Sequence, residues 1–349
     1  MTQGHSGEAG SLRTADFDYH LPPELIAQEP LEDRSASRML VLERETGRVE
    51  HRRFREIGSF LRPGDLLVVN DTRVSAFRLR GRRPTGAAVE ALFLQRAGDG
   101  LYRALMKPGR RLRAGDEVLF GEGEKEVRAE VVQRLDDGSR LVRLVSEGAE
   151  EKIRQIAETP LPPYVRRPLP AGERYQTVYG AREGSTAAPT AGLHFTAELL
   201  EELKAQGVGI VNVTLHIGTS TFRPVRSETL DGHRLEGEWI SLSQEAAEVI
   251  NNAQGRVIAV GTTSVRTLEA AAAGPGRVRA VEGETDLFIK PGHRFQVVQG
   301  MVTNFHMPRS TLLVLVCAFA GREKVLRAYQ EAVRERYRFL SLGDAMLIL

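Results

Sequence analysis

One change in hydrophobic periodicity constrains the fold of this chain more than any other feature. From about residue 74 to 147, short apolar runs with strand-like alternation are separated by Gly and Asp turns such as AGDG, AGDE and LDDG. No long helical pattern interrupts them, so the stretch predicts a small antiparallel β-barrel. On both sides helix and strand patterns alternate, as in ELLEELKAQG followed by VGIVNVTLH. We therefore expect an α/β fold: a discontinuous α/β domain with an inserted small antiparallel β-barrel domain.

The expected boundaries follow from these changes of pattern. Residues 1–14 form a flexible N-terminal extension, 15–73 the first part of the α/β domain, 74–150 the inserted barrel and 151–349 the second part. The proline-rich segment LPPYVRRPLP predicts a stiff extended connection back from the barrel. A chain of 349 residues is long enough for two domains, each with its own core.

The sequence predicts a cytoplasmic protein without a membrane partner. No stretch approaches the roughly 20 apolar residues of a membrane span, and the first residues, MTQGHSGEAGSLRT, lack the apolar core of a signal peptide. The single cysteine, Cys317, lies in the apolar run LLVLVCAFA and is expected to fill the core of a protein in a reducing compartment. A monomer is expected, although no motif specifies the oligomeric state.

Polar residues follow several predicted strands at the point where each strand ends. VNVTLH ends in His216, MVTNFH ends in His306, LLVVN leads into DTR, and VIAVG leads into TTSVR. In open α/β sheets ligands bind beyond the carboxyl ends of the strands. The side chains expected to converge there are Asn70, Arg73, His194, His216, Thr262, Thr263 and His306.

The stretch PTAGLHFT places His194 just before a predicted helix. Thr196 is a good N-cap for TAELLEELKA, and Gly207 ends the pattern. A helix N-terminus is electropositive and can receive an anion, and a neutral imidazole beside it can act as a base. A histidine that only fills a turn is the alternative interpretation. The cap does not need the imidazole, so the fold is expected to tolerate its loss.

The stretch GTTSVRTLEAA predicts a second helix that starts directly from a buried strand. Its first turns carry hydroxyls and a guanidinium, from Thr263, Ser264 and Arg266. Together with free backbone amides, these groups suit a carboxylate or a phosphate. Ordinary helix capping would explain the same residues.

Several well-known site patterns are absent from the sequence. There is no GxxxxGK[ST] loop and no GxGxxG after a strand, so the usual nucleotide and dinucleotide sites are not supported. There is no HExxH or CxxC pattern for a metal and no GxSxG elbow for a serine hydrolase. These absences leave a metal possible only through residues that are distant in the sequence.

The cationic residues are unusual in kind: the chain has 42 Arg and 6 Lys. The guanidinium group binds phosphate oxygens in a bidentate way that an ammonium group cannot. A codon bias toward Arg, or a solvated face, would explain the ratio equally well. The clusters that form a candidate nucleic-acid-binding surface contain Arg78, Arg80, Arg82, Arg83, Arg110 and Arg111.

The ordered motifs carry a family resemblance over nearly the whole chain. They are DFDYHLPPELIAQEPLEDRSASRMLVL, LRPGDLLVVNDTRV, RYQTVY, AAPTAGLHFT, GTTSVRTLEAA, MVTNFHMPRSTLL, AFAGRE and YRFLSLGDAMLIL. The sequence resembles the S-adenosylmethionine:tRNA ribosyltransferase-isomerases of queuosine biosynthesis. The resemblance implies transfer and isomerisation of the ribosyl part of S-adenosylmethionine onto 7-aminomethyl-7-deazaguanine at the wobble position of tRNA. The implied products are epoxyqueuosine-tRNA, adenine and methionine.

This activity gives the candidate residues expected roles. His194, His216 and His306 are expected to be catalytic, and which one acts as acid or base stays open. The expected contacts to S-adenosylmethionine, the co-substrate, are Asn70, Arg73, Thr190, Gly192, Arg223, Thr262, Thr263, Ser264, Arg266 and Asn304. Two other classes remain as alternatives: a metal-dependent hydrolase that uses the histidines, and a non-catalytic RNA-binding protein.

The chain departs from the family pattern at a few positions. Ser220 stands where a second glycine is usual, and HRLEGEW lacks the second histidine expected after His233. Lys290 and His293 replace aromatic positions, and Leu342 stands where tyrosine is common. The resemblance therefore assigns no role to the loop 231–239.

Overall fold

The structure is a computed structural model that describes residues 12–349 except 168, 170–171, 220, 222–224 and 226, and it does not describe the side chain of Arg110. Of the N-terminal extension expected over residues 1–14, residues 1–11 lie outside the described residues. The chain divides into two compact units. The first comprises Met1–Asn70, Thr190–Val213 and Ser220–Leu349, and the second comprises Asp71–Pro189 and Thr214–Thr219. Each unit is described by itself below.

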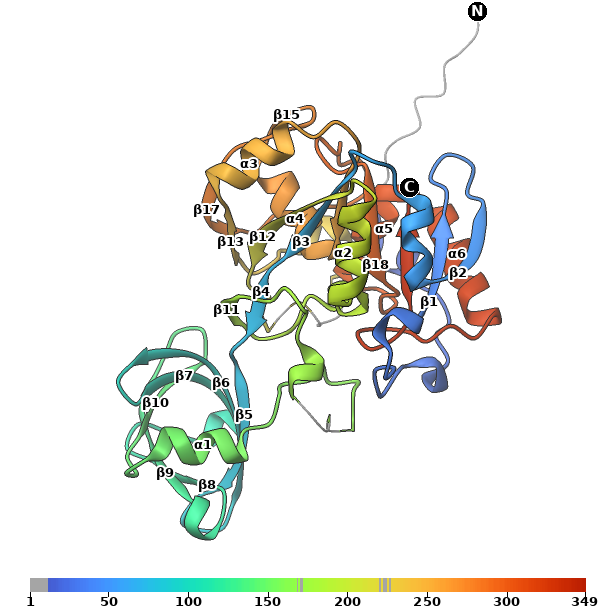
Figure 1. Cartoon of the computed structure of the whole chain (residues 1–349). Helices are drawn as coiled ribbons and strands as arrows, with labels where there is room; N and C mark the ends of the chain where they lie inside the picture. The colour runs from blue at the N-terminus through green and yellow to red at the C-terminus, as the bar shows by residue number, and fades with distance from the viewer. Residues whose placement is uncertain (1–11, 168, 170–171, 220, 222–224, 226) are drawn as a thin grey trace, which may run out of the picture. The chain divides into compact units, whose positions relative to one another are not determined.

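A mixed β-sheet forms the centre of the first unit (Figure 1). Among the described residues nine strands form it, in the order β17-β13-β12-β3-β14-β18-β19-β1-β2. Their bounds are β1 Arg38–Leu42, β2 Val49–Arg53, β3 Leu66–Asn70, β12 Gly209–Leu215, β13 Glu238–Leu242, β14 Val257–Val260, β17 Val281–Thr285, β18 Gly300–Asn304 and β19 Ala345–Ile348.

Strand direction in this sheet determines which residues share an edge. β12, β3, β14 and β18 are parallel, whereas β19 and β1 run the opposite way. The ends of β3, β14 and β18 therefore lie at the same edge as the start of β1. The three central strands, LLVVN, VIAV and GMVTN, are buried along their whole length, as expected for parallel strands covered on both faces.

Five α-helices belong to this unit: α2 Ala197–Ala205, α3 Gln244–Asn251, α4 Gly261–Ala270, α5 Thr311–Ala320 and α6 Arg322–Arg334. Serine or threonine caps three of them, because Thr196, Ser243 and Ser310 each accept a hydrogen bond from the backbone amide three residues later. α4 packs on β3, β14 and β18. A short hairpin of β15 Ala272–Gly274 and β16 Arg277–Val278 follows it.

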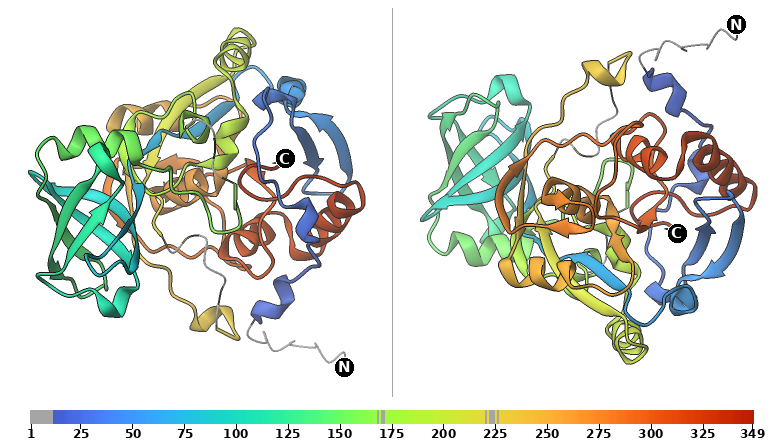
Figure 2. Two further views of the ribbon diagram at one scale, coloured as in Figure 1. Left: turned by 90° about the horizontal axis from the view of Figure 1, so that it is seen from below. Right: turned by 90° about the horizontal axis from the view of Figure 1, so that it is seen from above.

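The second unit contains a closed antiparallel barrel, visible in both views of Figure 2. The strands follow one another as β10-β7-β6-β5-β8-β9 around it. Their bounds are β5 Phe77–Arg82, β6 Ala88–Gly98, β7 Leu101–Lys107, β8 Glu117–Phe120, β9 Val127–Arg134 and β10 Arg140–Leu144. Alternate residues such as Leu79, Phe93 and Val131 fill the interior. The expected fold class, α/β with an inserted antiparallel β-barrel, is confirmed.

Smaller elements complete the second unit. Helix α1, Ala149–Ile156, packs on β9, and β11, Arg182–Ser185, pairs in parallel with β4, Thr72–Val74. In the described part of either unit, none of the helices has the length and apolar character that crossing a membrane requires.

Candidate active site

Topology brings three of the sequence-predicted residues together with a serine at one edge of the large sheet. Thr190 and His194 belong to the short 3-10 helix η8, Thr190–His194, while Asn304 ends β18 and Ser37 precedes β1. The sheet order explains this, since the end of β18 and the start of β1 lie at the same edge. Ser37 is a residue that the sequence analysis missed, because it stands before a strand rather than after one.

A directed chain of hydrogen bonds runs through the His194 imidazole. The Thr190 hydroxyl donates to Asn304 Oδ1 (2.8 Å), and Asn304 Nδ2 lies 3.3 Å from His194 Nε2. On the other side, His194 Nδ1 lies 2.7 Å from Ser37 Oγ, which donates to the carbonyl of Arg34 (3.0 Å). These partners assign the proton to Nδ1 and the acceptor role to Nε2.

His194 is also part of the core of the first unit. Its side chain is buried, with 5% of the residue exposed, and the ring packs on Phe54 at a centroid distance of 5.0 Å. Burial lowers the pKa of His194 to about 4, so the ring is neutral near pH 7. The neutral imidazole agrees with the sequence analysis. The ring has buried partners on both sides, so loss of His194 is expected to lower stability, and the expectation that the fold tolerates this loss stays a prediction.

His306 lies two residues beyond Asn304 in the loop after β18. Its Nε2 atom is 2.7 Å from Thr303 Oγ1, and its backbone carbonyl accepts a hydrogen bond from the Tyr19 hydroxyl (2.5 Å). The residue is 9% exposed, and burial lowers the pKa of His306 to about 3. This second imidazole is therefore neutral and rigidly held.

The first turn of α4 opens at the same edge, directly after β14. Gly261 has a φ of +88°, which lets the chain pass from strand to helix without a loop. Val260, at the N-cap position, provides no side-chain cap. The residue Thr263 is only 9% exposed, and its buried hydroxyl has no hydrogen-bond partner among the described residues. A buried donor without a partner beside free helix amides suits an anionic or strongly accepting ligand group.

Two other candidate side chains on α4 form hydrogen bonds or an ion pair with other groups of the protein. The Ser264 hydroxyl donates to the Val260 carbonyl (2.9 Å). Arg266 forms a buried ion pair with Glu238 of β13 and donates to the carbonyls of Leu287 (3.1 Å) and Thr285 (3.2 Å). Its guanidinium is thus held against β13 and β17 instead of among the other predicted site residues.

In the second unit, His216 lies against β11 and beside an acidic group. Its Nδ1 atom is 2.7 Å from the Thr72 hydroxyl, and a Cβ on Gly184 would lie 2.6 Å from its Nε2 atom. The Thr214 hydroxyl donates to Asp71 Oδ1 (2.6 Å). Only a glycine at position 184 leaves room for this ring.

Charges around His216 act on its pKa in opposite directions. Partial burial lowers the pKa, the nearby Asp71 carboxylate raises it, and Arg182 lowers it. The pKa of Asp71 is itself raised by burial. Sequence analysis missed Asp71, Thr72 and Gly184, even though the first two lie between the predicted Asn70 and Arg73 in the motif LLVVNDTRV.

The remaining residues predicted to bind the substrate are buried, paired with a carboxylate or outside the described part of the structure. Asn70 is fully buried at the end of β3, Gly192 is buried in η8, and Thr262 is buried in the first turn of α4. Arg73 forms an ion pair with Glu173 (2.6 Å). Arg223 lies outside the described residues, as does Ser220.

The arginines predicted to bind tRNA are mostly paired with carboxylates. Arg78 lies 3.9 Å from Glu90, and the other ion pairs on this part of the barrel are Arg80–Glu158 (3.3 Å), Arg82–Glu126 (2.6 Å) and Arg83–Asp116 (2.8 Å). Arg111 is exposed in the turn after β7, and the side chain of Arg110 lies outside the described part of the structure.

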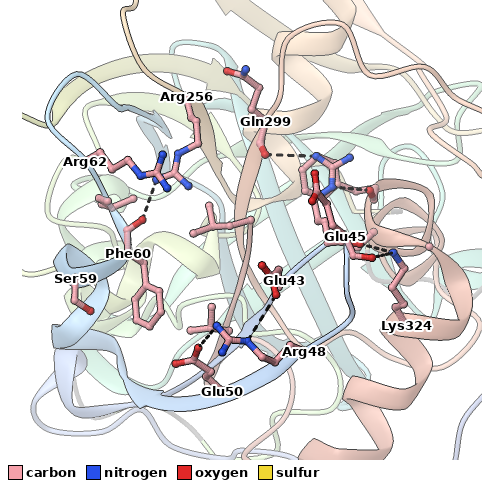
Figure 3. Close-up of a pocket in the computed structure, with 17 residues that line it drawn as sticks. Glu43, Glu45, Arg48, Glu50, Ser59, Phe60, Arg62, Arg256, Gln299 and Lys324 are labelled. Carbon is pink, nitrogen blue, oxygen red and sulfur yellow. Dashed lines mark hydrogen bonds and ion pairs between the residues drawn. The ribbon is translucent and has the colours of Figure 1, made fainter.

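A polar cavity of about 830 Å³ lies at the opposite edge of the large sheet (Figure 3). Residues that precede β3, β14 and β18 line it, together with residues that follow β1. Two of its cations have partners within the protein: Arg256 pairs with Asp65, and Lys324 donates to the carbonyls of Arg44 and Glu45. None of the sequence-predicted site residues lines this cavity.

Within the described residues there is no group of three or more His, Cys, Asp or Glu side chains arranged to hold a metal ion. The described residues form two candidate sites, one in each unit: Thr190, His194, Thr263, Asn304 and His306 in the first, and Asp71, Thr72, Gly184 and His216 in the second.

Comparison with known proteins gives full-length matches. The family model of queuosine biosynthesis proteins matches residues 14–348. An S-adenosylmethionine:tRNA ribosyltransferase-isomerase of Symbiobacterium thermophilum is 52% identical over 343 residues, which is 97% of this chain and all of the relative. One from Thermoanaerobacter sp. (strain X514) is 48% identical over the same shares of the two chains.

A solved structure also matches. The S-adenosylmethionine tRNA ribosyltransferase from Thermotoga maritima is 41% identical, with a TM-score of 0.56 over 96% of this chain and 100% of that chain. Together with the full-length family match, this shows that the chain belongs to the family of queuosine biosynthesis proteins.

Proposed function

We propose that this chain is an S-adenosylmethionine:tRNA ribosyltransferase-isomerase. It transfers and isomerises the ribosyl moiety of S-adenosylmethionine onto 7-aminomethyl-7-deazaguanine at the tRNA wobble position, giving epoxyqueuosine-tRNA, adenine and methionine. The observation that carries the proposal is the match to relatives of that name, at about half identity and over 97% of this chain. Because tRNA is the acceptor, we place the activity in the cytoplasm, with a monomer as the active form.

The reaction needs a group that removes a proton from the ribose carbon next to the sulfonium, since the positive sulfur acidifies that position. We assign this role to His216. Burial makes the net shift of the His216 pKa downward, so the resting imidazole can accept a proton, and the neighbouring Asp71 carboxylate favours the protonated form that results. Asp71 is then a positioning residue that acts through His216.

The two buried histidines suit a different task. With pKa values of about 4 and about 3, His194 and His306 stay neutral near pH 7. A neutral imidazole can exchange hydrogen bonds with the uncharged adenine or ribose of the donor without introducing a charge. Of the two, His194 has a defined tautomer, because Ser37 and Asn304 hold its two nitrogens.

The start of α4 suits the methionine carboxylate of the donor. Backbone amides of the first turn and the Thr263 hydroxyl, which has no partner among the described residues, provide donors there. Thr262 and Thr190 stay predicted contacts, although the Thr190 hydroxyl already donates to Asn304. Arg266 fits a supporting role better than direct contact, because Glu238 and two carbonyls already engage its guanidinium. Asn70, Arg73, Gly192, Asn304 and Arg223 stay predicted contacts, whereas the Ser264 hydroxyl already donates to the Val260 carbonyl.

The test is incubation of the purified protein with labelled S-adenosylmethionine and tRNA that carries the aminomethyl precursor. Release of adenine and methionine only when both substrates are present supports the proposal. The proposal involves no metal, so a chelator leaves turnover unchanged, whereas loss of turnover on chelation indicates the metal-dependent hydrolase class. Binding of tRNA without any affinity for S-adenosylmethionine indicates a non-catalytic RNA-binding protein.

A further inference from the structure

Ion pairing divides the arginines of the barrel into two groups. Most of the described arginines lie within 4 Å of a carboxylate oxygen, including three that are about half exposed: Arg96, Arg128 and Arg143, with 53%, 56% and 52% of their side chains accessible. A phosphate that approaches such a pair meets the carboxylate as well as the guanidinium, and the like charge opposes binding.

Three exposed arginines are different. Arg111, Arg113 and Arg134 are exposed, and none of them lies within ion-pair distance of a carboxylate in the described part of the chain. Arg111 belongs to the short 3-10 helix η5, Gly109–Arg111, between β7 and β8; Arg113 follows it, and Arg134 ends β9.

Backbone and side-chain contacts bring these three residues to one end of the barrel. The buried guanidinium of Arg140 donates to the carbonyls of Gly109 and Leu112 in the η5 turn and to that of Gly138 (3.1 Å) in the β9–β10 turn. Arg140 thus ties the two turns together. Arg134 is the direct cross-strand partner of Arg140, so their side chains lie on the same face.

The turn that follows Arg113 also lies against β9. The amide of Gly115 donates to the carbonyl of Val131 (2.8 Å), and the amide of Val131 donates to the carbonyl of Asp116 (2.9 Å). Burial lowers the pKa of Arg140, and the positive charge of Arg134 lowers it further, as expected for two close cations.

The carboxylates at this end mostly serve other partners. Asp116 pairs with Arg83 and accepts from the amide of Arg113, and Asp137 pairs with Arg103 and accepts from Ser139. Asp136 is exposed and offsets one positive charge. This end of the barrel therefore has more accessible guanidinium groups than unpaired carboxylates, and hydrogen bonds from Arg140 fix the backbone turns at this end.

We propose that Arg111, Arg113 and Arg134, the arginine rim, bind phosphate groups of the tRNA backbone. The proposal rests on the proposed function, which supplies tRNA as the partner. Guanidinium groups bind phosphate oxygens in bidentate fashion, and phosphate contacts fix the position of a nucleic acid without reading its sequence. The arginine rim shares Arg111 with the clusters that the sequence indicates but leaves out Arg80, Arg82 and Arg83, because these three are paired with carboxylates.

The experiment compares two triple variants with the same change of charge. The first, R111A/R113A/R134A, removes the arginine rim. The matched control, R96A/R128A/R143A, removes three paired arginines of the same barrel with similar exposure. A third variant, R111K/R113K/R134K, keeps the charge. Affinity for tRNA is measured by filter binding over a range of salt concentrations, and thermal unfolding checks that each protein is folded.

The rim variant is expected to bind tRNA roughly 10- to 100-fold more weakly near 0.1 M salt. The slope of its log affinity against log salt concentration is expected to decrease by the contribution of about two to three phosphate contacts. The control keeps the wild-type salt dependence, and the lysine variant keeps most of the affinity. Wild-type binding by the rim variant, or an equal loss in the control, overturns the inference. If the wild-type protein itself neither binds tRNA nor releases adenine, the proposed function fails instead.

Discussion

At the scale of single residues, the His194 imidazole joins stability to function. Its two nitrogens are hydrogen-bonded to Ser37 and Asn304, and its ring packs on Phe54. A residue held in this way has a fixed tautomer and a fixed orientation, both of which catalysis needs, and its removal leaves buried polar groups without partners.

Replacing His194 with alanine should therefore affect two quantities at once. We expect the free energy of unfolding to fall by about 1–3 kcal/mol, because the Ser37 and Asn304 side chains lose a buried partner, and turnover to fall by roughly a hundredfold or more. Chemical denaturation and adenine release on one preparation measure both. Ser37→Ala is the companion variant, with an intact imidazole and a smaller loss of turnover. Wild-type turnover in a folded His194→Ala protein contradicts the assignment.

Burial of His306 predicts a dependence of stability on pH. In the unfolded chain a histidine titrates near pH 6.5, whereas in the folded protein the pKa of His306 is lowered to about 3. Below pH 6.5 the unfolded state binds more protons, so the contribution of His306 to stability is intact above that pH and is lost progressively as the pH falls toward 3.

The measurement is the free energy of unfolding of the wild type and of His306→Asn at pH 7 and at pH 5. The difference in stability between the two proteins should shift in favour of the variant at pH 5, by about 1–2 kcal/mol. If the free energies of unfolding of the two proteins change with pH in parallel, His306 takes up its proton in the folded state as well, and the prediction is contradicted.

Gly184 offers a test of the His216 assignment that leaves the imidazole in place. A methyl group at this position would lie 2.6 Å from His216 Nε2, so Gly184→Ala has to displace the ring. We expect roughly a tenfold or greater loss of kcat, as general acid–base catalysis depends on geometry. The control is Gly98→Ala, where the nearest atom lies at 3.8 Å and nothing has to move. Equal kcat values for the two variants would mean that the position of His216 does not matter.

At the scale of elements, the junction of β14 and α4 is the most informative feature. The helix begins at Gly261 without a side-chain cap, and a fully capped helix would have no donors left for a ligand. Two neighbouring hydroxyls differ in their hydrogen bonding. The hydroxyl of Ser264 donates to the Val260 carbonyl, whereas that of Thr263 has no partner among the described residues.

This difference predicts opposite effects for two substitutions. Thr263→Val removes a hydroxyl that no protein group uses, so stability should stay the same or rise slightly, while the KM for S-adenosylmethionine should rise by roughly five- to tenfold. Ser264→Ala removes a bond within the helix and should leave KM unchanged. Unfolding curves and saturation kinetics measure the two effects, and an unchanged KM in Thr263→Val would exclude the hydroxyl from the donor site.

At the scale of the whole molecule, the sequence predicts the architecture better than the site. The insertion is visible because a barrel strand and an α/β strand have different hydrophobic patterns, and the end of β18 is visible because a histidine and an asparagine follow a buried run. Ser37, Thr72 and Gly184 escape notice because each acts only through a residue far away in the chain. The ion pairs of Arg80, Arg82 and Arg83 are hidden for the same reason, since Glu158, Glu126 and Asp116 are distant in sequence.

In the proposed reaction, the ribosyl group of S-adenosylmethionine becomes part of the tRNA. The most direct measurement uses S-adenosylmethionine with isotopic label in the ribose carbons and mass spectrometry of nucleosides from the digested tRNA. We expect the precursor nucleoside to be replaced by one that contains all of the labelled ribose carbons, with free adenine and methionine in equal amounts. A precursor nucleoside that gains no label, or gains only the methyl group of the donor, would contradict it.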